Sequence, residues 1–198
     1  FAMSEALTII LKRNDPTSAA KQVSLTELGS IKINKEERTK MYKTIPRSSV
    51  IGFLIGVLPG AGATIASFLA YGMERNVVSD EEKEKFGKGS VNGLSAPETA
   101  NNAACSGSFV PMLTLGIPGS GTTAVMLGAL LGFGVQPGPR LYMTNPEIFW
   151  SIIMSMYIGM VILLILNLPL IPYIARILAV PKNYLIPLIL FFSVTGIY

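Results

Sequence analysis

Two short stretches of this 198-residue chain share a Pro-Gly pattern that could bind an anion without any charged side chain. The first break, residues 58–64, reads Leu-Pro-Gly-Ala-Gly-Ala-Thr, and the second break, residues 117–123, reads Ile-Pro-Gly-Ser-Gly-Thr-Thr. Proline lacks a backbone N–H and glycine is costly to order, so each stretch predicts a gap between two short helices. A helix that starts after such a gap presents unpaired N–H groups with partial positive charge, which is an anion site.

Glycines in both breaks would let a ligand approach the backbone, and the hydroxyl groups could cap a helix or bond a ligand. The alternative is a pair of kinks that serve only packing, which membrane helices tolerate. Two copies with matching flanks in an apolar chain favour a transporter's substrate site. The predicted substrate-binding residues are Pro59, Gly60, Ala61, Gly62 and Thr64, with Pro118, Gly119, Ser120, Gly121, Thr122 and Thr123.

Glu98 is the only Asp, Glu, Lys or Arg between Lys88 and Arg140. A carboxylate embedded in such a block is a candidate for cation coordination or proton coupling. The side-chain carbonyls of Asn101 and Asn102 could serve a hard cation such as sodium, so we predict these three residues as ion-coupling. Residues 95–98 also match a capping box, in which Glu98 would only bond back to the start of its helix, and the two interpretations are compatible.

The composition predicts an integral membrane protein. Half of the residues are hydrophobic and only 14% are charged, against about 25% in soluble domains. Residues 48–73, 99–139, 148–175 and 183–198 contain no Asp, Glu, Lys or Arg, and a membrane helix needs only about 20 apolar residues. A soluble protein with a large core, the alternative, would have to bury all four runs.

Charge and residue usage exclude several classes of function. Residues 12–47 carry nine Lys or Arg against four Asp or Glu, which beside membrane runs is typical of a cytoplasmic loop. The loop lacks the interleaved aromatic residues of a single-strand binder, so we expect no nucleic-acid partner. The chain has no histidine and one cysteine, Cys105, so we expect no metal site, cofactor or internal disulfide. A membrane-embedded hydrolase would lack a base apart from Glu98, and we predict no enzyme.

The elements that must position these residues are predicted to be helices of one partial transporter domain over residues 1–198. We expect an all-α fold in which the two breaks form an internal, inverted repeat of broken or re-entrant elements. The segments are a polar cytoplasmic loop (12–47), the first broken element (48–75), a charged loop (76–90), a small-residue helix with the second broken element (91–140), and C-terminal spans (147–198). The polar loop could include a short amphipathic helix around residues 35–42, and the charged loop a short surface helix. Pro169 and Pro172 are expected to kink or end the span of residues 148–175. Residues 1–11 resemble the end of a membrane helix, and the chain reads as a piece of a longer membrane protein.

Lysines and arginines on both sides of residues 48–73 favour a hairpin that opens to the cytoplasm, although a single interrupted span stays open. Few positive charges follow residue 133, which suggests the periplasmic side and hence the inversion. Residues 60–66 also resemble a dinucleotide-binding glycine pattern. We reject that site because no strand-helix-strand rhythm surrounds it.

Several motifs together resemble the large membrane subunit of tripartite tricarboxylate transporters. They are residues 56–64, 96–104 and 115–120, with Phe-Gly-Lys-Gly at 86–89 and Pro-Gly-Pro at 137–139. The resemblance covers most of residues 1–140 and is to an interior and C-terminal portion of longer proteins. It implies a multi-pass protein of the bacterial inner membrane that takes up di- or tricarboxylates such as citrate, driven by a Na⁺ or H⁺ gradient and not by ATP.

The resemblance also implies two partners, a small membrane subunit and a periplasmic solute-binding protein that delivers the carboxylate. The alternative function is a channel or scaffold subunit in the membrane with no substrate site of its own.

Overall fold

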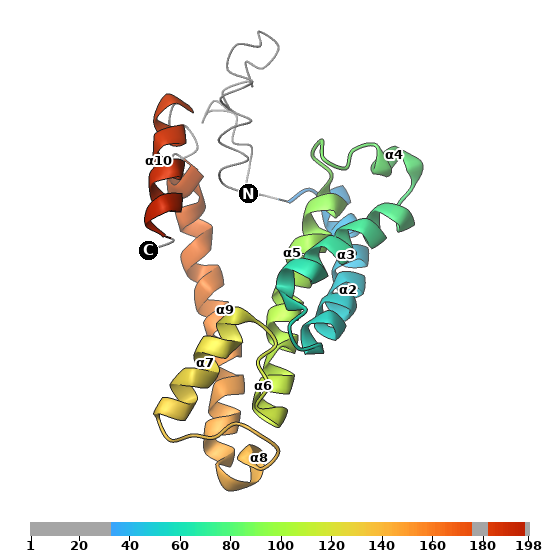
Figure 1. Cartoon of the computed structure of the whole chain (residues 1–198). Coiled ribbons are helices and arrows are strands. Elements are labelled where there is room, and N and C mark those ends of the chain that lie inside the picture. Colours follow the sequence, from blue (N-terminus) through green and yellow to red (C-terminus); the bar gives the residue numbers. More distant parts are fainter. Residues whose placement is uncertain (1–32, 176–181, 197–198) are drawn as a thin grey trace. The chain divides into compact units, whose positions relative to one another are not determined.

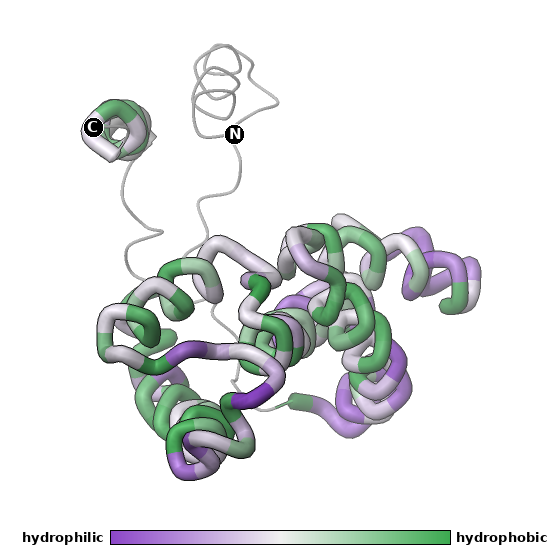
Figure 2. Tube along the Cα trace, turned by 60° about the horizontal axis from the view of Figure 1, so that its bottom comes forward, coloured by the Kyte–Doolittle hydropathy of each residue, from purple (hydrophilic) through white to green (hydrophobic). Residues whose placement is uncertain are grey.

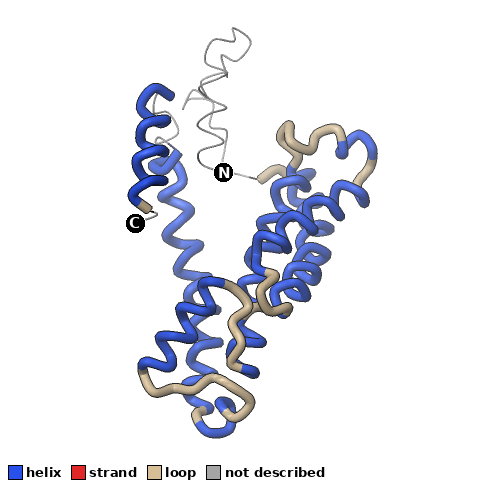
Figure 3. Tube along the Cα trace, in the orientation of Figure 1, coloured by secondary structure: helices blue, strands red, loops and turns tan. Residues whose placement is uncertain are grey.

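A computed structural model describes residues 33–175 and 182–196, and every regular element in these ranges is an α-helix, as predicted. The expectation for residues 1–11 lies outside the described ranges. In chain order the helices are α2 (Lys35–Val57), α3 (Gly62–Val77), α4 (Asp80–Lys83), α5 (Val91–Gly107), α6 (Phe109–Leu115), α7 (Gly121–Gly132), α8 (Leu141–Thr144), α9 (Pro146–Ala175) and α10 (Lys182–Thr195) (Figures 1 and 3).

The chain divides into two compact units, residues 32–156 and residues 1–31 with 157–198. Both breaks and all predicted substrate and ion residues lie in the unit of residues 32–156. The fold of that unit is therefore what positions the candidate site.

Helices α2, α3 and α5 pack together in this unit, and their shared faces carry mostly small residues at a four-residue spacing (Figure 1). Residues four apart lie on one face of a helix, and small side chains let two backbones approach closely. The buried residues are Thr44, Ser48, Gly52 and Gly56 on α2, Ala66, Ala70 and Glu74 on α3, and Asn92, Ala96, Ala100, Ala104 and Gly107 on α5.

Helices α2 and α5 run parallel with their backbones in contact. A Cβ added to Gly52 would overlap the carbonyl oxygen of Ala100, and one added to Gly56 would overlap that of Ala104. Both pairs advance by one turn in the same direction, which makes the two helices parallel. Glycine at these two positions thus determines how closely α2 approaches α5.

Helix α3 returns antiparallel to α2, so the two form a hairpin with its tip in the first break. Glu74 near the end of α3 bonds Thr44 in the first half of α2. A break between two helices occurs where it was predicted, but α2 begins at Lys35 instead of near residue 48. Residues 35–47 were predicted as part of the polar loop, with a short helix around residues 35–42 as the alternative. They are helical because Asn34 and Glu37 form a capping box and the helix continues past Pro46.

The second break has a different path. Helix α6 follows α5 after Ser108 and ends at Gly116, which is left-handed (φ 71°). Residues 117–120 then return along α6, because a Cβ on Gly119 would contact Ser108 at the start of α6. After α7, Pro137 lies against Gly116 at the end of α6. Helices α6 and α7 therefore run side by side in the same direction (Figure 1).

These directions correct the predicted inverted repeat. The helices that lead into the two breaks, α2 and α5–α6, run parallel, whereas inverted copies would oppose each other. In addition, α3 reverses the direction of α2 while α7 keeps the direction of α6. The inversion was inferred from flanking charge, which reports the side on which a segment leaves the membrane and not how a break turns.

Large aliphatic side chains form a second core beyond the small-residue bundle. Met112 and Leu113 of α6 and Leu141 of α8 are buried together, with side chains of α7 and early α9 against them. Figure 2 shows hydrophobic or neutral colour over most of the described chain, with hydrophilic colour gathered in a few stretches. The start of α7 is thus held between a small-residue bundle and an apolar core.

Helix α9 is the one helix of the described ranges that is long and apolar enough to cross a membrane. Residues 146–171 have a mean hydropathy of 2.4 in their most apolar window. Pro169 and Pro172 do not end this helix, which continues through both to Ala175. Proline removes one backbone hydrogen bond, and membrane helices tolerate that loss where the freed group is satisfied locally.

Candidate substrate and ion sites

The two Pro-Gly breaks touch through their backbones. The N–H of Gly60 donates to the carbonyl oxygen of Gly119 at 3.2 Å. Gly119 also lies against neighbouring backbone, since a Cβ there would be 2.8 Å from Cβ of Ser108 and 3.3 Å from the carbonyl oxygen of Gly56. Two stretches far apart in the sequence therefore meet at one place.

The first break is a tight turn. The N–H of Ala61 donates to the carbonyl oxygen of Leu58 at 3.2 Å, and Gly60 (φ 80°) and Gly62 (φ 69°) are left-handed, a conformation that favours glycine. Helix α3 starts at Gly62, and Ala61 before it offers no side-chain cap. The first N–H groups of α3 consequently have neither an acceptor within the helix nor a capping side chain.

The second break is an extended segment that ends in a capping box. The Oγ of Ser120 accepts from the N–H of Thr123 at 3.2 Å, and Oγ1 of Thr123 accepts from the N–H of Ser120 at 2.8 Å. Gly119 and Gly121 do not have positive φ angles. The exposed residues Gly121 and Thr122 begin α7, so the first turn of α7 is accessible.

The predicted substrate residues differ in exposure. Gly119 and Thr123 are buried, and their contacts hold the second break in place instead of facing solvent. A ligand could therefore reach the breaks through the more exposed members. Pro59, Gly60, Thr64, Gly121 and Thr122 are exposed, and Ala61, Gly62, Pro118 and Ser120 are half-buried.

The predicted capping box at residues 95–98 does not form. Helix α5 already starts at Val91, and Oγ of Ser90 accepts from the N–H of Gly93 at 3.1 Å. Ser90 offers the same kind of cap as Ser95 but lies one turn earlier, and Pro97 is accommodated inside the helix. Glu98 is exposed on α5, and its carboxylate makes no hydrogen bond or ion pair within the described part of the chain.

The two asparagines that were predicted to bind an ion donate hydrogen bonds to different partners. Nδ2 of Asn101 donates to Oγ of Ser67 on α3 at 3.3 Å, which ties the early turns of α3 to α5. Nδ2 of Asn102 donates to the backbone carbonyl of Glu98 at 2.9 Å, within its own helix. The structure thus keeps Glu98, Asn101 and Asn102 on one helix but does not join their oxygens around a common point.

Glu74 is the buried acid that the sequence analysis missed. It is fully buried, and its Oε1 accepts from Oγ1 of Thr44 (2.8 Å), Nη2 of Arg47 (2.7 Å) and Nδ2 of Asn92 (3.2 Å). In the sequence Glu74 stands with the charged residues that follow the first apolar run. The spacing of the sequence could have revealed it. Glu74 follows Ala70 by four residues, so it lies on the same face of α3, which packs against α2 and α5.

A second acidic residue fastens the charged loop to α2. Glu82 accepts from Nζ of Lys40 and from Oγ of Ser90, each at 3.0 Å. Burial raises the pKa of Glu82, but the hydrogen bonds from Lys40 and Ser90 outweigh burial and hold that pKa below its usual value. The hydrogen bonds to Glu82 and Glu36 raise the pKa of Lys40. Both partners are therefore charged at neutral pH.

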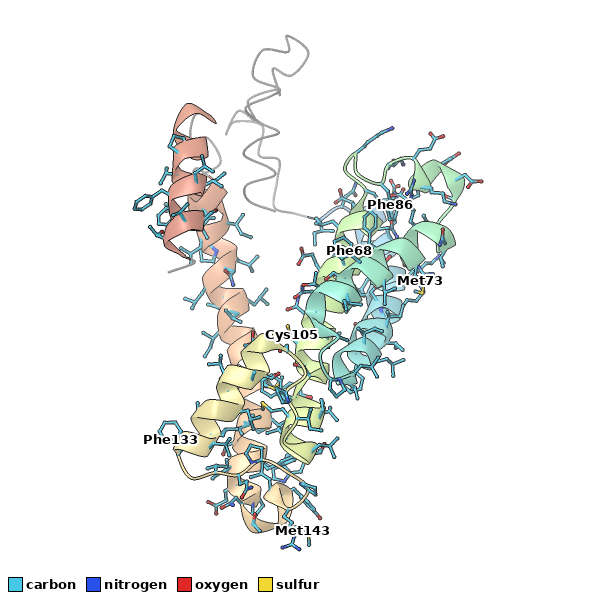
Figure 4. The ribbon with its side chains drawn as sticks, viewed as in Figure 1. Phe68, Met73, Phe86, Cys105, Phe133 and Met143 are labelled. Atoms are coloured by element: carbon cyan, nitrogen blue, oxygen red, sulfur yellow. The ribbon has the colours of Figure 1, made fainter. Side chains whose placement is uncertain are left out.

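An aromatic contact holds the same loop on α3. The rings of Phe86 and Tyr71 meet edge to face with their centroids 5.2 Å apart, and Phe86 is labelled in Figure 4. The polar ends of α2, α3 and α5 are thus joined at the end of the bundle that lies away from the two breaks.

Comparison of the sequence with known proteins gives a family match. The sequence model of the Tripartite tricarboxylate transporter TctA family matches residues 1–198. Two relatives are from Agrobacterium vitis. The "Uncharacterized 52.8 kDa protein in TAR-I ttuC' 3'region" is 39% identical over 186 residues, 94% of this chain and 37% of that protein. The "Uncharacterized protein in TAR-II ttuC' 3'region" is 45% identical over 147 residues, 74% of this chain and 60% of that protein.

The chain therefore spans 37% and 60% of the lengths of these two relatives. No solved structure matches it. Because the family model covers every residue, the chain belongs to the tripartite tricarboxylate transporter TctA family of membrane transporter components, as the resemblance predicted.

Proposed function

We propose that the whole protein takes up di- or tricarboxylates such as citrate, as the translocation subunit of a tripartite system in the bacterial inner membrane. A small membrane subunit and a periplasmic solute-binding protein would be its partners, in agreement with the tripartite family. The observation that carries the proposal is the hydrogen bond between Gly60 and Gly119. Because of this contact, the N-termini of α3 and α7 open close together, which supports a shared site for the carboxylates of one substrate.

Charge arithmetic supports coupling to a cation. Each helix N-terminus is equivalent to about half a positive charge, so α3 and α7 together supply about one. Neither break contains a lysine or arginine. A dicarboxylate or tricarboxylate carries two or three negative charges, and we propose that co-transported Na⁺ or H⁺ offsets the remainder.

Helix lengths support a site near the middle of the membrane. The uncharged part of α2 after Arg47, residues 48–57, is about 15 Å long, half of a hydrocarbon core of about 30 Å. We therefore propose that the α2–α3 hairpin re-enters from the cytoplasmic side. The basic residues at its open end favour that side, namely Lys43, Arg47, Arg75, Lys83, Lys85 and Lys88. Helices α5 and α6, residues 91–115, would cross completely.

The exposed face of α5 is the proposed position for a coupling ion near Glu98, Asn101 and Asn102. An ionised side chain in lipid costs about 2.5–3.5 kcal/mol or more, so Glu98 should face water or protein. We assign its face to the transport pathway, or to the parts of the whole protein that lie outside this chain.

A channel or scaffold subunit is the second candidate function. The burial of Gly119 and Thr123 favours it, because these residues support packing of the second break and not ligand contact. Saturable uptake that depends on an ion gradient separates the transporter from this candidate.

The first experiment is uptake of labelled citrate into proteoliposomes that hold the full-length protein, its small partner and the loaded binding protein. An inward Na⁺ gradient, an inward H⁺ gradient and no gradient are compared. We expect uptake that requires the binding protein and one gradient. Failure across a panel of carboxylates under every gradient would favour the channel or scaffold subunit.

A matched pair of variants tests the site itself. Gly121 and Gly128 both lie on α7 with ordinary φ angles, and a Cβ at either would meet nothing within 4 Å. Gly121→Leu should reduce uptake strongly because its side chain would cover the N-terminus of α7, whereas Gly128→Leu should leave uptake near that of the wild type. Equal uptake in the two variants would contradict a substrate site at the second break.

A further inference from the structure

Several buried polar atoms around Glu74 have no hydrogen-bond partner. All three donors converge on Oε1 of Glu74, while its Oε2 is buried and accepts nothing. Oδ1 of Asn92 and Oγ of Ser48 and Ser95 are also buried without a partner, as is Nε of Arg47. A buried oxygen without a partner is unfavourable, so these four oxygens would favour a ligand that satisfies them.

The two serine hydroxyls are buried but do not bond their own helix. A hydroxyl inside a helix can donate to the carbonyl four residues earlier, as those of Thr39 and Ser106 do. Ser48 and Ser95 make no such bond. Their oxygens are therefore free to bind something other than their own backbone.

These oxygens come from three helices and from adjacent turns of the bundle. Thr44 of α2 bonds Asn92 of α5 (2.8 Å), and both bond Glu74 of α3. Ser48 follows Thr44 by one turn of α2, and Ser95 follows Asn92 by about one turn of α5. Because α2 and α5 run parallel, both hydroxyls lie on the same side of the Thr44–Asn92 pair.

We propose that this cluster binds a monovalent metal cation, with Glu74, Asn92, Ser48 and Ser95 as its oxygen ligands. Carboxylate, amide and hydroxyl oxygens are hard ligands that suit hard cations. A divalent ion usually takes several acidic ligands, and within the described residues no three or more His, Cys, Asp or Glu side chains are grouped so that they could hold a metal ion. The single carboxylate of Glu74 matches a single positive charge.

In the structure, Arg47 supplies the positive charge next to Glu74 that a bound cation would otherwise supply. Its guanidinium neutralises Glu74 at 2.7 Å, and its side chain is 37% exposed, so it can turn outward to water. A bound metal ion would compete with Arg47 for Glu74. This inference does not depend on the proposed substrate site, and it adds the buried carboxylate of Glu74 to the exposed carboxylate of Glu98 that was proposed above for a coupling ion.

The test is binding of ²²Na⁺ to the purified full-length protein, without substrate or binding protein, together with thermal unfolding in NaCl, KCl and choline chloride at equal ionic strength. We expect wild-type protein to bind and to be stabilised by a metal cation but not by choline. A response to K⁺ alone would keep the class of ligand and change the ion. No difference from choline would overturn the proposal, and is the result expected if water fills the cluster.

Serine variants separate binding from folding. Ser48→Ala and Ser95→Ala remove hydroxyls that have no partner, so stability in choline should not fall, while cation affinity should fall about tenfold, or about 1.4 kcal/mol per lost ligand. Ser49→Ala, a half-buried neighbour, is the control and should keep wild-type affinity. Equal affinity in all three variants would contradict the proposal.

The charged residues provide an independent check. Glu74→Gln should abolish the cation binding that is measured without substrate, and Arg47→Gln should raise affinity by removing the competitor. Glu147→Gln, which changes an exposed carboxylate on α9, should leave binding unchanged. Loss of binding in Glu98→Gln alone would assign the ion to the exposed face of α5 instead. Because no uptake is measured, the outcome is distinguishable from failure of the proposed transport function.

Discussion

The first and second Pro-Gly breaks share one sequence pattern but are built differently. The first is a tight turn between antiparallel helices, with left-handed glycines at 60 and 62 and no side-chain cap. The second is an extended segment between parallel helices, with ordinary glycines and a Ser120–Thr123 capping box. The pattern thus determines that the helix stops, while the neighbouring helices determine how the chain continues.

Glycine accordingly has two separate functions in the two breaks. Gly60 has open space around its Cα and needs glycine for its backbone angle. Gly119 has an ordinary backbone angle and needs glycine because Ser108 and Gly56 leave no room for a side chain. The same substitution should therefore fail for different reasons at the two positions, and the following predictions test that difference in the full-length protein.

Gly56→Ala should have the largest effect because Gly56 packs against Ala104 of α5 and its carbonyl oxygen lies beside Gly119 in the second break. The added methyl group would overlap the carbonyl of Ala104 and separate α2 from α5, at a cost of about 3 kcal/mol in unfolding free energy. Denaturant or thermal unfolding in detergent measures this. Gly72→Ala is the control, because Gly72 is exposed within α3 and alanine should stabilise the helix by about 0.5–1 kcal/mol. Equal stability of the two variants would show that the α2–α5 contact is not tight.

Gly119→Ala should destabilise the protein by about 2 kcal/mol through overpacking against Ser108. Adding Ser108→Gly removes the Cβ that would lie 2.8 Å away and should recover part of the loss. The same second substitution should not rescue Gly60→Ala. If Ser108→Gly rescues both variants or neither, the steric function assigned to Gly119 is wrong.

Gly60→Ala should cost about 1–2 kcal/mol because an L-residue is strained in the left-handed region. Gly60→Asn should cost less, since asparagine adopts this conformation more readily, and thermal unfolding ranks the two variants. At position 119 asparagine should be worse than alanine because it is larger. A common ranking at both positions would remove the distinction between the two glycines.

Ser120→Ala should cost about 1 kcal/mol through loss of the α7 cap. Ala61→Ser, the matching position in the first break, should give little gain because Ala61 has helical backbone angles and a cap usually needs extended ones. Amide hydrogen exchange at the first turns of α7 and α3 reports both changes. A clear gain from Ala61→Ser would mean that the two breaks accept the same cap.

Glu82 tests the opposite end of the bundle and should affect the breaks least. The pKa of Glu82 is lowered in the folded protein. Its contribution to the free energy of unfolding is therefore present above the usual pKa of 4.5 and is lost as the pH falls through the pKa of the folded state. The contribution is below about 1 kcal/mol, because Lys40 is partly exposed. Hydrogen exchange in residues 79–90 should rise at acid pH, and Glu82→Gln should remove this dependence. An equal rise at residues 58–64 would show that the two ends are coupled.

Much of the fold follows from local sequence. Both breaks, the small-residue helix after residue 90, the short helix among the acidic residues near 80 and the helix after residue 145 lie where the pattern predicts helices and gaps. These features depend on proline, glycine and apolar runs, which act through the backbone nearby. The start of α2 was predicted too late, because charged residues 35–47 were interpreted as loop although Asn34 and Glu37 cap a helix there.

The sequence by itself determined the membrane character, the family and the presence of two helix breaks, since composition and local motifs carry those properties. Tertiary structure alone decided that α2 and α5 run parallel, that Gly60 meets Gly119, and that Glu74 is buried while Glu98 is exposed. The physical reason is that burial and direction depend on which helix faces are in contact. Those contacts join residues about 30 to 60 positions apart, which no local pattern records.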